Sequence, residues 1–589
     1  MSENAMPEER VELLGSPYGD ASYELIRKFN RAFADKSGMI RDLDDKKMPR
    51  FPVLLRPRRF GKSTFVQMLK CFYDVSYADR YEQLFAGTAI HKASLESHNS
   101  YHVLDLEFSK IYSHDEKSLI EGFVICLENG ISDFMKRYPD FRFEPGERER
   151  SAPAYLLTAF LTAYDRFSSQ QRLYLMIDEY DNFANNLLSS NLELFKAITS
   201  SGGFLKDFYA SIKDGTVKQI ARTFITGVSS VSLDSLTSGF NISRNVTARG
   251  CFNNYAGLTE RELRILVPQL VDVRSLGVGA DEIIERMKPV YDGYCFSRHA
   301  RNTVYNSSMC LYYLDEVNEA GEFLPPEKYL DPASDHDGKK LQQLFGIAED
   351  GLTDTIIGTY LAGGVFFIDG IDENINLNQS SKYSKSQLLS MLYYLGYLTI
   401  DPKRSTGARL ALKIPNLFMS RLFARCVVDL RLKPSDVFRT QKLDISSMLA
   451  SSDDISDFAV SCTEFLSAVF TSQVLAHMSE MALNLLLYAK LDSMDEVSVE
   501  LQKSLRVVGK GEKFADLVIA ANEGQSDECV YIIELKYAAK GDISEAKLAK
   551  LREEAADQVS DYRSALEFRD KLVKSFVMIF SGCQCVYCG

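Results

Sequence analysis

The chain has 589 residues, of which 46% are hydrophobic and 25% charged, and its formal net charge is −13. This length exceeds one ordinary domain, so three or four folded units are expected. The composition is typical of a globular protein, and without a run of the ~20 apolar residues of a membrane helix we expect no membrane partner. The acidic balance argues against tight nonspecific binding of DNA over the whole surface, but it leaves room for a local basic channel.

The first residues and the cysteines indicate a compartment. The N-terminal stretch MSENAMPEERVELL is acidic and lacks an apolar segment, so we expect an intracellular, cytoplasmic protein that is not secreted. The eleven cysteines form no disulfide framework and are expected to be reduced. Near the C-terminus, Cys583, Cys585 and Cys588 fit a reduced tail better than a metal clip, because a closed zinc site takes four ligands.

The segment from Phe51 to Thr64, FPVLLRPRRFGKST, is an apolar strand that runs into a Gly-Lys-Ser-Thr turn. In the phosphate-binding pattern G-x-x-x-x-G-K-[ST] the first glycine would stand at position 56, where this chain has Arg56. Glycine there gives access to backbone angles that are closed to other residues. The loop is therefore expected to turn differently, with help from Pro57.

The remaining chemistry of a phosphate loop is present. Lys62 can reach the β- and γ-phosphates, Ser63 can bind Mg²⁺, and the helix expected over Thr64–Tyr73 points its N-terminus at the anion. The alternative is a basic surface turn. The nucleotide-binding candidates in this segment are Arg56, Pro57, Arg58, Arg59, Phe60, Gly61, Lys62, Ser63 and Thr64.

A second apolar strand, Leu173–Asp181 (LYLMIDEYD), ends in acids. Asp178 is expected to hold Mg²⁺ and Glu179 to polarise the attacking water, although a strand that ends in solvated acids is common. Further strands are expected over His102–Ser109 and Arg222–Val228. In the latter, Thr226 is placed to sense the γ-phosphate. Strands that alternate with helices predict a parallel sheet covered on both faces.

Several motifs occur together in one order along the chain. They are FADKSGMI (33–40), RPRRFGKST (56–64), IDEYD (177–181), ITGVSSVS (225–232), YDGYCF (291–296), YYLGYLTI (393–400) and IPN (414–416). In this arrangement, over roughly residues 20 to 565, the chain resembles the AAA-ATPase-like family that is usually fused to a C-terminal PD-(D/E)XK nuclease-like domain. The missing first glycine is a habit of that family. The resemblance implies ATP and Mg²⁺ as cofactors.

A second group of chemistry-bearing residues lies near the C-terminus. Phe514–Ala520 (FADLVIA) and Val530–Tyr537 (VYIIELKY) predict two strands of a hairpin. Asp516 lies in the first strand, and Glu534 and Lys536 lie two residues apart in the second, so that they share a face. Metal-dependent phosphodiester cleavage needs acids that hold Mg²⁺ or Mn²⁺ and a lysine that acts on the phosphate. Such a pair also occurs by chance as a charged sheet face.

The nuclease-like resemblance adds three residues. Glu480, on a helix expected over Met478–Leu491, is a further metal-ligand candidate, and Gln558 and Tyr562 match a trailing Gln and Tyr, with Gln558 a catalytic candidate. The family commonly has Gly-Arg shortly before the aspartate, whereas Lys513 stands in that region here. Lys540, Lys547, Lys550 and Arg552 could form a basic channel, but such a run is more often a solvated helix face.

The expected fold class is α/β: an N-terminal P-loop, AAA-like parallel sheet with a helical lid, a mixed middle region and a C-terminal α/β nuclease-like domain. The predicted division is a loose tail (1–20), the ATPase domain (21–255), lid and connector (256–338), a winged-helix-like middle region (339–453) and the nuclease-like domain (454–589).

The favoured function is an ATP-binding and ATP-hydrolysing protein that regulates a Mg²⁺-dependent nuclease acting on DNA or RNA. Two alternatives remain: a signalling ATPase whose C-terminal domain is a catalytically silent binding module, and an assembly protein in which ATP drives homo-oligomer formation. An intact Asp-Glu-Lys set favours the first of the three.

Overall fold

The computed structural model describes most of the chain and separates it into two compact units. The first contains residues up to 334 together with 367–418, and the second contains 335–366 and 419–589. The chain therefore enters the second unit, returns to the first and leaves it again. The predicted domain boundaries stay predictions. The described residues are 13–93, 95–111, 115–168, 170–191, 193–195, 203–231, 239–326, 335–373, 375, 382–431, 443–470, 478–507, 509–539, 543–569 and 571–589.

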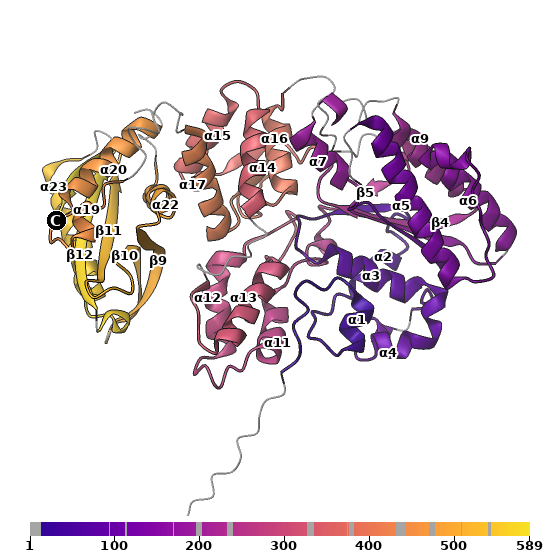
Figure 1. Ribbon diagram of the computed structural model, residues 1–589, viewed down its shortest axis with the longest axis horizontal. Coiled ribbons are helices and arrows are strands. Elements are labelled where there is room, and N and C mark those ends of the chain that lie inside the picture. The colour runs from indigo at the N-terminus through magenta and orange to yellow at the C-terminus, as the bar shows by residue number, and fades with distance from the viewer. Residues whose placement is uncertain are drawn as a thin grey trace, which may run out of the picture. The chain divides into compact units, whose positions relative to one another are not determined.

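The first unit is built on a five-stranded sheet of order β2-β3-β4-β1-β5, and all of its strand pairs are parallel. Every residue of β1 and β3 is buried, as expected for parallel strands that are covered on both faces. Figure 1 shows α5, α6 and α9 on one side of this sheet and α1 to α4 on the other. The strands are β1 Pro52–Leu55, β2 His102–Glu107, β3 Leu173–Asp178, β4 Ile220–Gly227 and β5 Arg244–Asn245.

The predicted strands and the helix after the phosphate loop are confirmed within one to three residues. Between β3 and β4 the chain forms α7 and α9, and residues 192 and 196–202 lie outside the described residues. The helices of this part are α1 Tyr23–Lys28, α2 Met39–Asp44, α3 Lys62–Tyr73, α4 Tyr81–Phe85, α5 Glu116–Arg137, α6 Pro153–Phe167, α7 Asn182–Ser190 and α9 Phe204–Gly215, with short 3₁₀ turns η1 Val75–Arg80, η2 His91–Ala93, η3 Glu149–Ser151 and η4 Gly250–Phe252.

A group of helices follows the sheet, in the region where a helical lid is predicted (256–338). Helix α11 begins with a capping box, in which Thr259 Oγ1 accepts from Glu262 N and Glu262 accepts from Thr259 N. The predicted connector (325–338) and the tail (1–20) lie in large part outside the described residues. The helices are α11 Glu260–Leu270, α12 Ala280–Tyr291, α13 Ser307–Ala320 and, after the return from the second unit, α16 Lys385–Tyr394.

The returning segment of the first unit packs beside the phosphate loop. A Cβ on Gly396, whose φ is +86°, would lie 2.9 Å from Pro57 Cβ, so only glycine fits there. The Tyr393 hydroxyl donates to Phe296 O, and Phe60 packs edge-on against Tyr294. The separated sequence motifs thus surround one loop. A small sheet of order β6-β8-β7 accompanies α16, with β6 Phe366–Ile368, β7 Thr399–Ile400 and β8 Leu410–Lys413.

The second unit contains a mixed sheet of order β13-β12-β11-β10-β9, in which β11 and β12 are parallel and the other pairs antiparallel. The predicted hairpin is β10–β11, and helix α23 covers an apolar cluster on this sheet. The elements are α14 Asp335–Gly346, α15 Leu352–Leu361, α17 Leu417–Arg431, α19 Ser446–Leu449, α20 Ser456–Val469, α22 Glu480–Leu491, β9 Val497–Val507, β10 Gly511–Ala521, β11 Cys529–Ala538, α23 Glu545–Tyr562, η7 Leu566–Phe568, β12 Leu572–Ser581 and β13 Gln584–Cys588.

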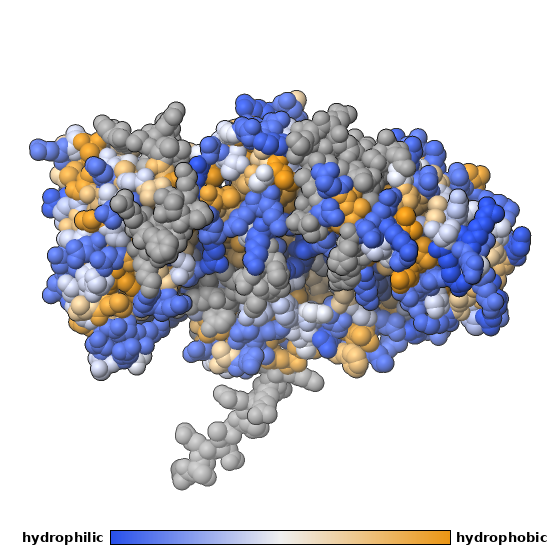
Figure 2. All heavy atoms as spheres, turned by 45° about the horizontal axis from the view of Figure 1, so that its top comes forward, coloured by the Kyte–Doolittle hydropathy of each residue, from blue (hydrophilic) through white to orange (hydrophobic). Residues whose placement is uncertain are grey.

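The surface and the cysteines add two facts. None of the helices within the described ranges is long and apolar enough to cross a membrane, and apolar side chains in the view of Figure 2 lie in small groups among hydrophilic ones. All eleven cysteines are free thiols. Over the described part of the chain, no three His, Cys, Asp or Glu side chains gather as a metal site, and the reduced tail at Cys583, Cys585 and Cys588 stays a prediction.

Candidate functional sites

The phosphate loop turns without its first glycine. Arg56 does not have a left-handed backbone; Arg59 (φ +68°) and Gly61 (φ +85°) do. Gly61 immediately precedes α3, so the loop leads its backbone into a helix N-terminus, which favours anions. The expectation that the loop turns differently is therefore confirmed, and the left-handed position has moved three residues along the chain.

Arg56 lies beneath the loop, away from any ligand. Its side chain is 1% exposed and donates to the carbonyl oxygens of Leu55, Thr247 and Phe252. The guanidinium also lies 4.2 Å from the ring centroid of Phe296. Within the described ranges no carboxylate pairs with it. The assignment of Arg56 as a nucleotide contact is thus corrected: it fastens the loop to the segments that follow β5.

Lys62 and Glu179 meet at the carboxyl ends of β1 and β3. Lys62 Nζ lies 3.4 Å from Glu179 Oε1 and donates to Pro57 O at 3.2 Å. Glu179 has a left-handed backbone, with φ +53°, which is uncommon for a residue other than glycine and is frequent at functional sites. The structure therefore brings the predicted phosphate-binding lysine and the predicted water-activating acid together.

Asp178 and Ser63 form the second pair at this edge. The Asp178 carboxylate accepts from Glu179 N at 2.9 Å, and the hydroxyl of the neighbouring Ser63 is among the groups that lower the pKa of Asp178. Burial raises the pKa of Asp178 to about 6, and the neighbouring Glu179 charge adds to this shift. A hydroxyl and a carboxylate in contact are oxygen donors of the kind that Mg²⁺ takes in nucleotide sites.

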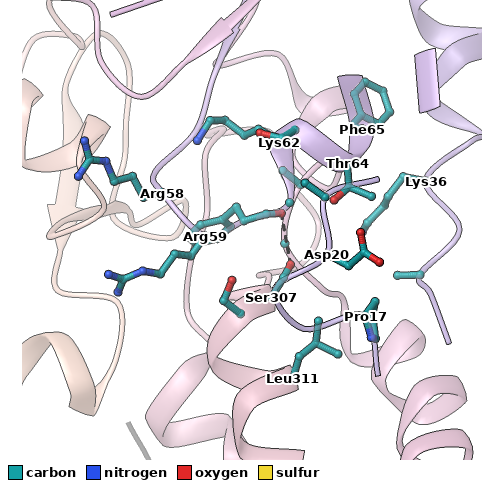
Figure 3. A pocket seen from close by; sticks show the side chains of 18 of the residues that line it. Pro17, Asp20, Lys36, Arg58, Arg59, Lys62, Thr64, Phe65, Ser307 and Leu311 are labelled. Atoms are coloured by element: carbon teal, nitrogen blue, oxygen red, sulfur yellow. Dashed lines mark hydrogen bonds between the residues drawn. The ribbon is translucent and has the colours of Figure 1, made fainter. Parts of the chain in front are cut away.

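A cavity of about 470 Å³ lies beside these pairs. One wall is the loop, including Arg58, Lys62 and Ser63, with Glu179 nearby; the opposite wall includes Leu311 of α13 (Figure 3). The loop is tied to that wall, because Ser307 Oγ donates to Phe60 O at 3.3 Å and Ser308 N to Arg59 O at 3.1 Å. The cavity is large enough for a drug-sized ligand.

Two parts of the chain that line this cavity were not anticipated from the sequence. One is the N-terminal segment, with Pro17, Asp20 and Lys36 in the wall, and the other is the start of α13. Lys36 is paired with Glu262 of α11 at 2.7 Å. Lys36 belongs to the FADKSGMI motif. This motif was the signal in the sequence that could have pointed to this part of the cavity wall, but no local pattern indicated that it lies beside the phosphate loop.

Thr226 does not reach the cavity. It is fully buried, and its hydroxyl donates to Leu54 O of the neighbouring strand at 2.6 Å. The expectation that it senses the γ-phosphate is therefore not supported by its position, because its polar atom serves the sheet. Asn182 was missed: it lines the cavity, accepts from Arg58 Nη2 at 3.0 Å and donates to Ser109 O.

In the second unit, Asp516 and Glu534 lie on adjacent strands and are both buried. Burial raises the pKa of Glu534 to about 7, assisted by the charge of Asp516, and burial likewise raises the pKa of Asp516. Asp516 Oδ1 accepts from Asn484 Nδ2 (2.8 Å) and Gln502 Nε2 (2.7 Å), and its Oδ2 accepts from Leu535 N (2.9 Å).

Lys536 lies between two acids. Its Nζ donates to Glu534 Oε1 at 2.8 Å and lies 3.5 Å from Glu480 Oε1. Burial alone would lower the pKa of Lys536, but the hydrogen bond and charge of Glu534 outweigh this effect and hold it above its usual value. The expectation that Lys536 projects freely toward a phosphate is therefore corrected for this state of the protein.

The outer members of the predicted nuclease-like set are placed differently. Glu480 Oε2 accepts from Tyr537 N, so Glu480 holds the end of β11 and the lysine. The assignment of Glu480 as a metal ligand stays a prediction. The Tyr562 hydroxyl lies 3.2 Å from Glu534 Oε2, whereas Gln558 is exposed on α23. Of the predicted basic channel, Lys540 lies outside the described residues.

A parallel sheet with a Gly-Lys-Ser loop between its strand β1 and helix α3 is consistent with a P-loop-like domain. Residues 17–237 match the AAA-ATPase-like family model, which is described as a predicted AAA-ATPase and covers less than half of the chain. The chain is also 26% identical over 296 residues to an uncharacterized protein in the vnfD 5′ region of Azotobacter chroococcum mcd 1. That match spans 49% of this chain and 50% of the relative.

Proposed function

We propose that the first unit binds Mg²⁺·ATP and hydrolyses it. The observation that carries this proposal is the meeting of the Lys62–Glu179 and Ser63–Asp178 pairs beside a 470 Å³ cavity at the start of α3. Lys62 and the first turn of α3 bind the β- and γ-phosphates, and Glu179 orients water for attack. The match to a predicted AAA-ATPase family supports the nucleotide and the reaction.

The side chains at this edge fit a magnesium ion. Ser63 and Asp178 offer a hydroxyl and a carboxylate side by side, and both are oxygen ligands of the kind that Mg²⁺ takes. When bound, Mg²⁺ neutralises charge on the phosphates. The chain's own part is to hold the ion from one side, through Ser63 and Asp178, while Lys62 holds the phosphates from the other.

Calorimetric titration of the nucleotide-free full chain with ATP in Mg²⁺, followed by measurement of phosphate release, tests this proposal. Saturable binding and slow multiple turnover are expected. If the wild-type protein binds neither ATP nor a non-hydrolysable analogue, the proposal is wrong, because every role that is proposed for the loop requires a bound nucleotide.

We further propose that the second unit carries a metal-dependent phosphodiesterase that acts on nucleic acid and is regulated by the ATPase. This candidate rests on the cluster of Asp516, Glu534 and Lys536, two acids and one lysine on adjacent buried strands. Because Lys536 is held by Glu534 and Glu480, a divalent cation that takes Glu534 would release the lysine toward a phosphate. The alternative is a signalling ATPase, or an assembly ATPase that forms homo-oligomers, whose second unit is a silent binding module.

A cleavage panel separates these two functions. Single- and double-stranded DNA and RNA are incubated with the full chain in Mg²⁺ or Mn²⁺, with and without ATP. Wild type is compared with Lys536→Ala and with Lys513→Ala, which removes an exposed lysine of β10. Cleavage that is lost only in Lys536→Ala supports the nuclease. Absence of cleavage of every substrate, with ATP turnover intact, supports the silent module.

A further inference from the structure

Asn484 brings an unsatisfied oxygen to the acidic cluster of the second unit. It lies one helical turn after Glu480 on α22 and is 1% exposed (Figure 1). Its Nδ2 donates to Asp516 Oδ1, while its Oδ1 is buried and has no hydrogen-bond partner among the described residues. A buried carbonyl oxygen without a partner destabilises the folded protein, so such an atom calls for an explanation.

The orientation of this amide is fixed by chemistry. A carboxylate accepts hydrogen bonds and donates none, so the group that faces Asp516 Oδ1 must be the Asn484 NH₂. Turning the amide over would place two oxygens against each other. The orphan atom is therefore an oxygen, and it needs either a proton donor or a cation.

The donors known at this cluster are already used. Gln502 Nε2 and Leu535 N donate to Asp516, and Lys536 Nζ donates to Glu534. The charges at the cluster are three carboxylates, Glu480, Asp516 and Glu534, against one lysine. With all of them ionised this leaves two negative charges in excess, the number that one divalent cation neutralises.

Gln502 makes the Asn484 hydrogen bond dispensable. In the pairing of β9 with β10, Leu501 pairs with Leu517 and Lys503 with Ala515, so that Gln502 and Asp516 fall at the interruption. Gln502 has φ +52°, and its amide reaches Asp516 Oδ1 at 2.7 Å. A left-handed backbone at a residue other than glycine is uncommon and is found more often at functional sites. With Gln502 and Leu535 N holding Asp516, the Asn484 amide is available for another role.

We infer that Asn484 is a cation ligand: its side-chain oxygen joins Asp516 and Glu534 in holding one divalent metal ion in the second unit. This inference rests on the proposed metal-dependent function and adds a residue to it. Amide oxygens and carboxylates are the ligands that Mg²⁺ and Mn²⁺ take, and one amide with two carboxylates leaves positions for water. Glu480 remains outside the shell, as the partner of Lys536.

Calorimetric titration of the nucleotide-free full chain with Mn²⁺ tests the assignment. Asp516→Ala defines which binding belongs to this site, since the nucleotide site stays intact in that variant. Asn484→Leu is expected to weaken the same binding step tenfold or more. Asn484→Asp, which keeps an oxygen and loses the NH₂, is expected to bind Mn²⁺ at least as tightly as wild type. Gln502→Leu is expected to weaken binding less than Asn484→Leu.

The variants separate a ligand from a structural residue. If Asn484 only props Asp516, then Asn484→Leu and Gln502→Leu each remove one hydrogen bond to Asp516 Oδ1 and should weaken Mn²⁺ binding to the same extent. Asn484→Asp adds a negative charge that attracts a cation whether or not the residue is a ligand, so the comparison of the two neutral variants decides. Thermal unfolding without metal checks that each variant folds, and Asn484→Asp should be less stable than wild type without Mn²⁺ and recover when Mn²⁺ is added. Should Asn484→Leu fail to fold, Asn484→Ala and Gln502→Ala make the same comparison.

Two negative results have different meanings. Wild type without an Asp516-dependent Mn²⁺ step overturns both the cation site and the role of Asn484. An Asp516-dependent step that Asn484→Leu leaves unchanged overturns the role of Asn484 alone, and a buried water molecule would then satisfy its oxygen.

Discussion

Lys62 and Glu179 form an ion pair of 3.4 Å at the edge of the sheet where the phosphates of a nucleotide would lie. The cation that is proposed to bind phosphate and the acid that is proposed to activate water thus hold each other in the nucleotide-free protein. The lysine is 4% exposed and the acid 18%, so the pair is largely withdrawn from water. Phosphate oxygens must compete with Glu179 for Lys62, and the released carboxylate then becomes available for a water molecule.

Replacing Lys62 with alanine should weaken ATP binding at least tenfold, because the charge-assisted contact to the β- and γ-phosphates is lost. Titration with ATP in Mg²⁺ measures the affinity. Lys47→Ala, at an exposed position before β1, serves as the control and should bind like wild type. ATP turnover by Lys62→Ala at the wild-type rate would mean that the loop is a basic surface turn.

Glu179→Gln should keep ATP binding and lower turnover roughly 10²–10⁴-fold, as expected for the loss of a general base. Binding should even tighten slightly, because the competitor for Lys62 has lost its charge. Affinity and single-turnover hydrolysis are measured separately on the same preparation. Glu107, which also lines the cavity, provides a matched variant. If Glu107→Gln shows the larger loss of turnover, the role of the base belongs to Glu107.

Asp178→Asn should stabilise the nucleotide-free protein and abolish hydrolysis. Burial raises the pKa of Asp178 to about 6 from 3.8. Between these two pH values the folded protein therefore keeps a proton on Asp178 that the unfolded chain has released. The stability contributed by this group is complete below about pH 4 and is lost as the pH rises through 6. Removing the charge should therefore gain about 1–3 kcal/mol at pH 7–8 without Mg²⁺.

The pH dependence of the free energy of unfolding tests this prediction. Unfolding is followed by calorimetry from pH 4 to 8, with Asp214→Asn at an exposed position as the control. The gap between Asp178→Asn and wild type should open between pH 4 and 6 and stay constant above. A gap that is independent of pH would place the effect in packing and leave the ionisation of Asp178 without a role.

The sequence was sufficient for the elements that local patterns encode. Runs of apolar residues predicted the strands that became β1 to β4, and the segments Phe514–Ala520 and Val530–Tyr537 predicted the β10–β11 hairpin. The pairs at the sheet edge also followed from the sequence, because residues at the ends of parallel strands meet at one edge. Each of these predictions starts from the residue pattern within a single strand or helix.

The rest depends on contacts between distant segments, which no local pattern encodes. The cavity wall joins Pro17 to Leu311, and Gly396 meets Pro57 across more than three hundred residues. Thr226 was predicted to face a ligand, but its hydroxyl donates to Leu54 O. The period of a strand does not reveal which neighbouring carbonyl oxygen will accept a hydrogen bond from a hydroxyl. Gln502 was not identified from the sequence, because its role depends on a left-handed backbone opposite Asp516 within the β9–β10 pairing. Its residue type alone gives no sign of this conformation.

Restoring the usual glycine of a phosphate loop should damage this protein. Arg56→Gly removes a buried guanidinium that joins three carbonyl oxygens and packs on two aromatic rings, and it leaves those carbonyls without donors. A loss of about 2–5 kcal/mol in the free energy of unfolding is expected. Arg56→Lys should recover only part of it, because an ammonium cannot reproduce the planar fork of donors.

Urea denaturation, with ATP affinity measured on whatever fraction folds, checks this prediction. Arg58→Gly is the matched control two residues along the same loop: Arg58 is exposed, and its loss should change stability by less than about 1 kcal/mol. The discriminating result is the order of the two variants. If the Arg56→Gly protein is as stable as wild type, the other contacts of the loop, including those with α13, are sufficient to hold it. Arg56 would then only fill space beneath the loop.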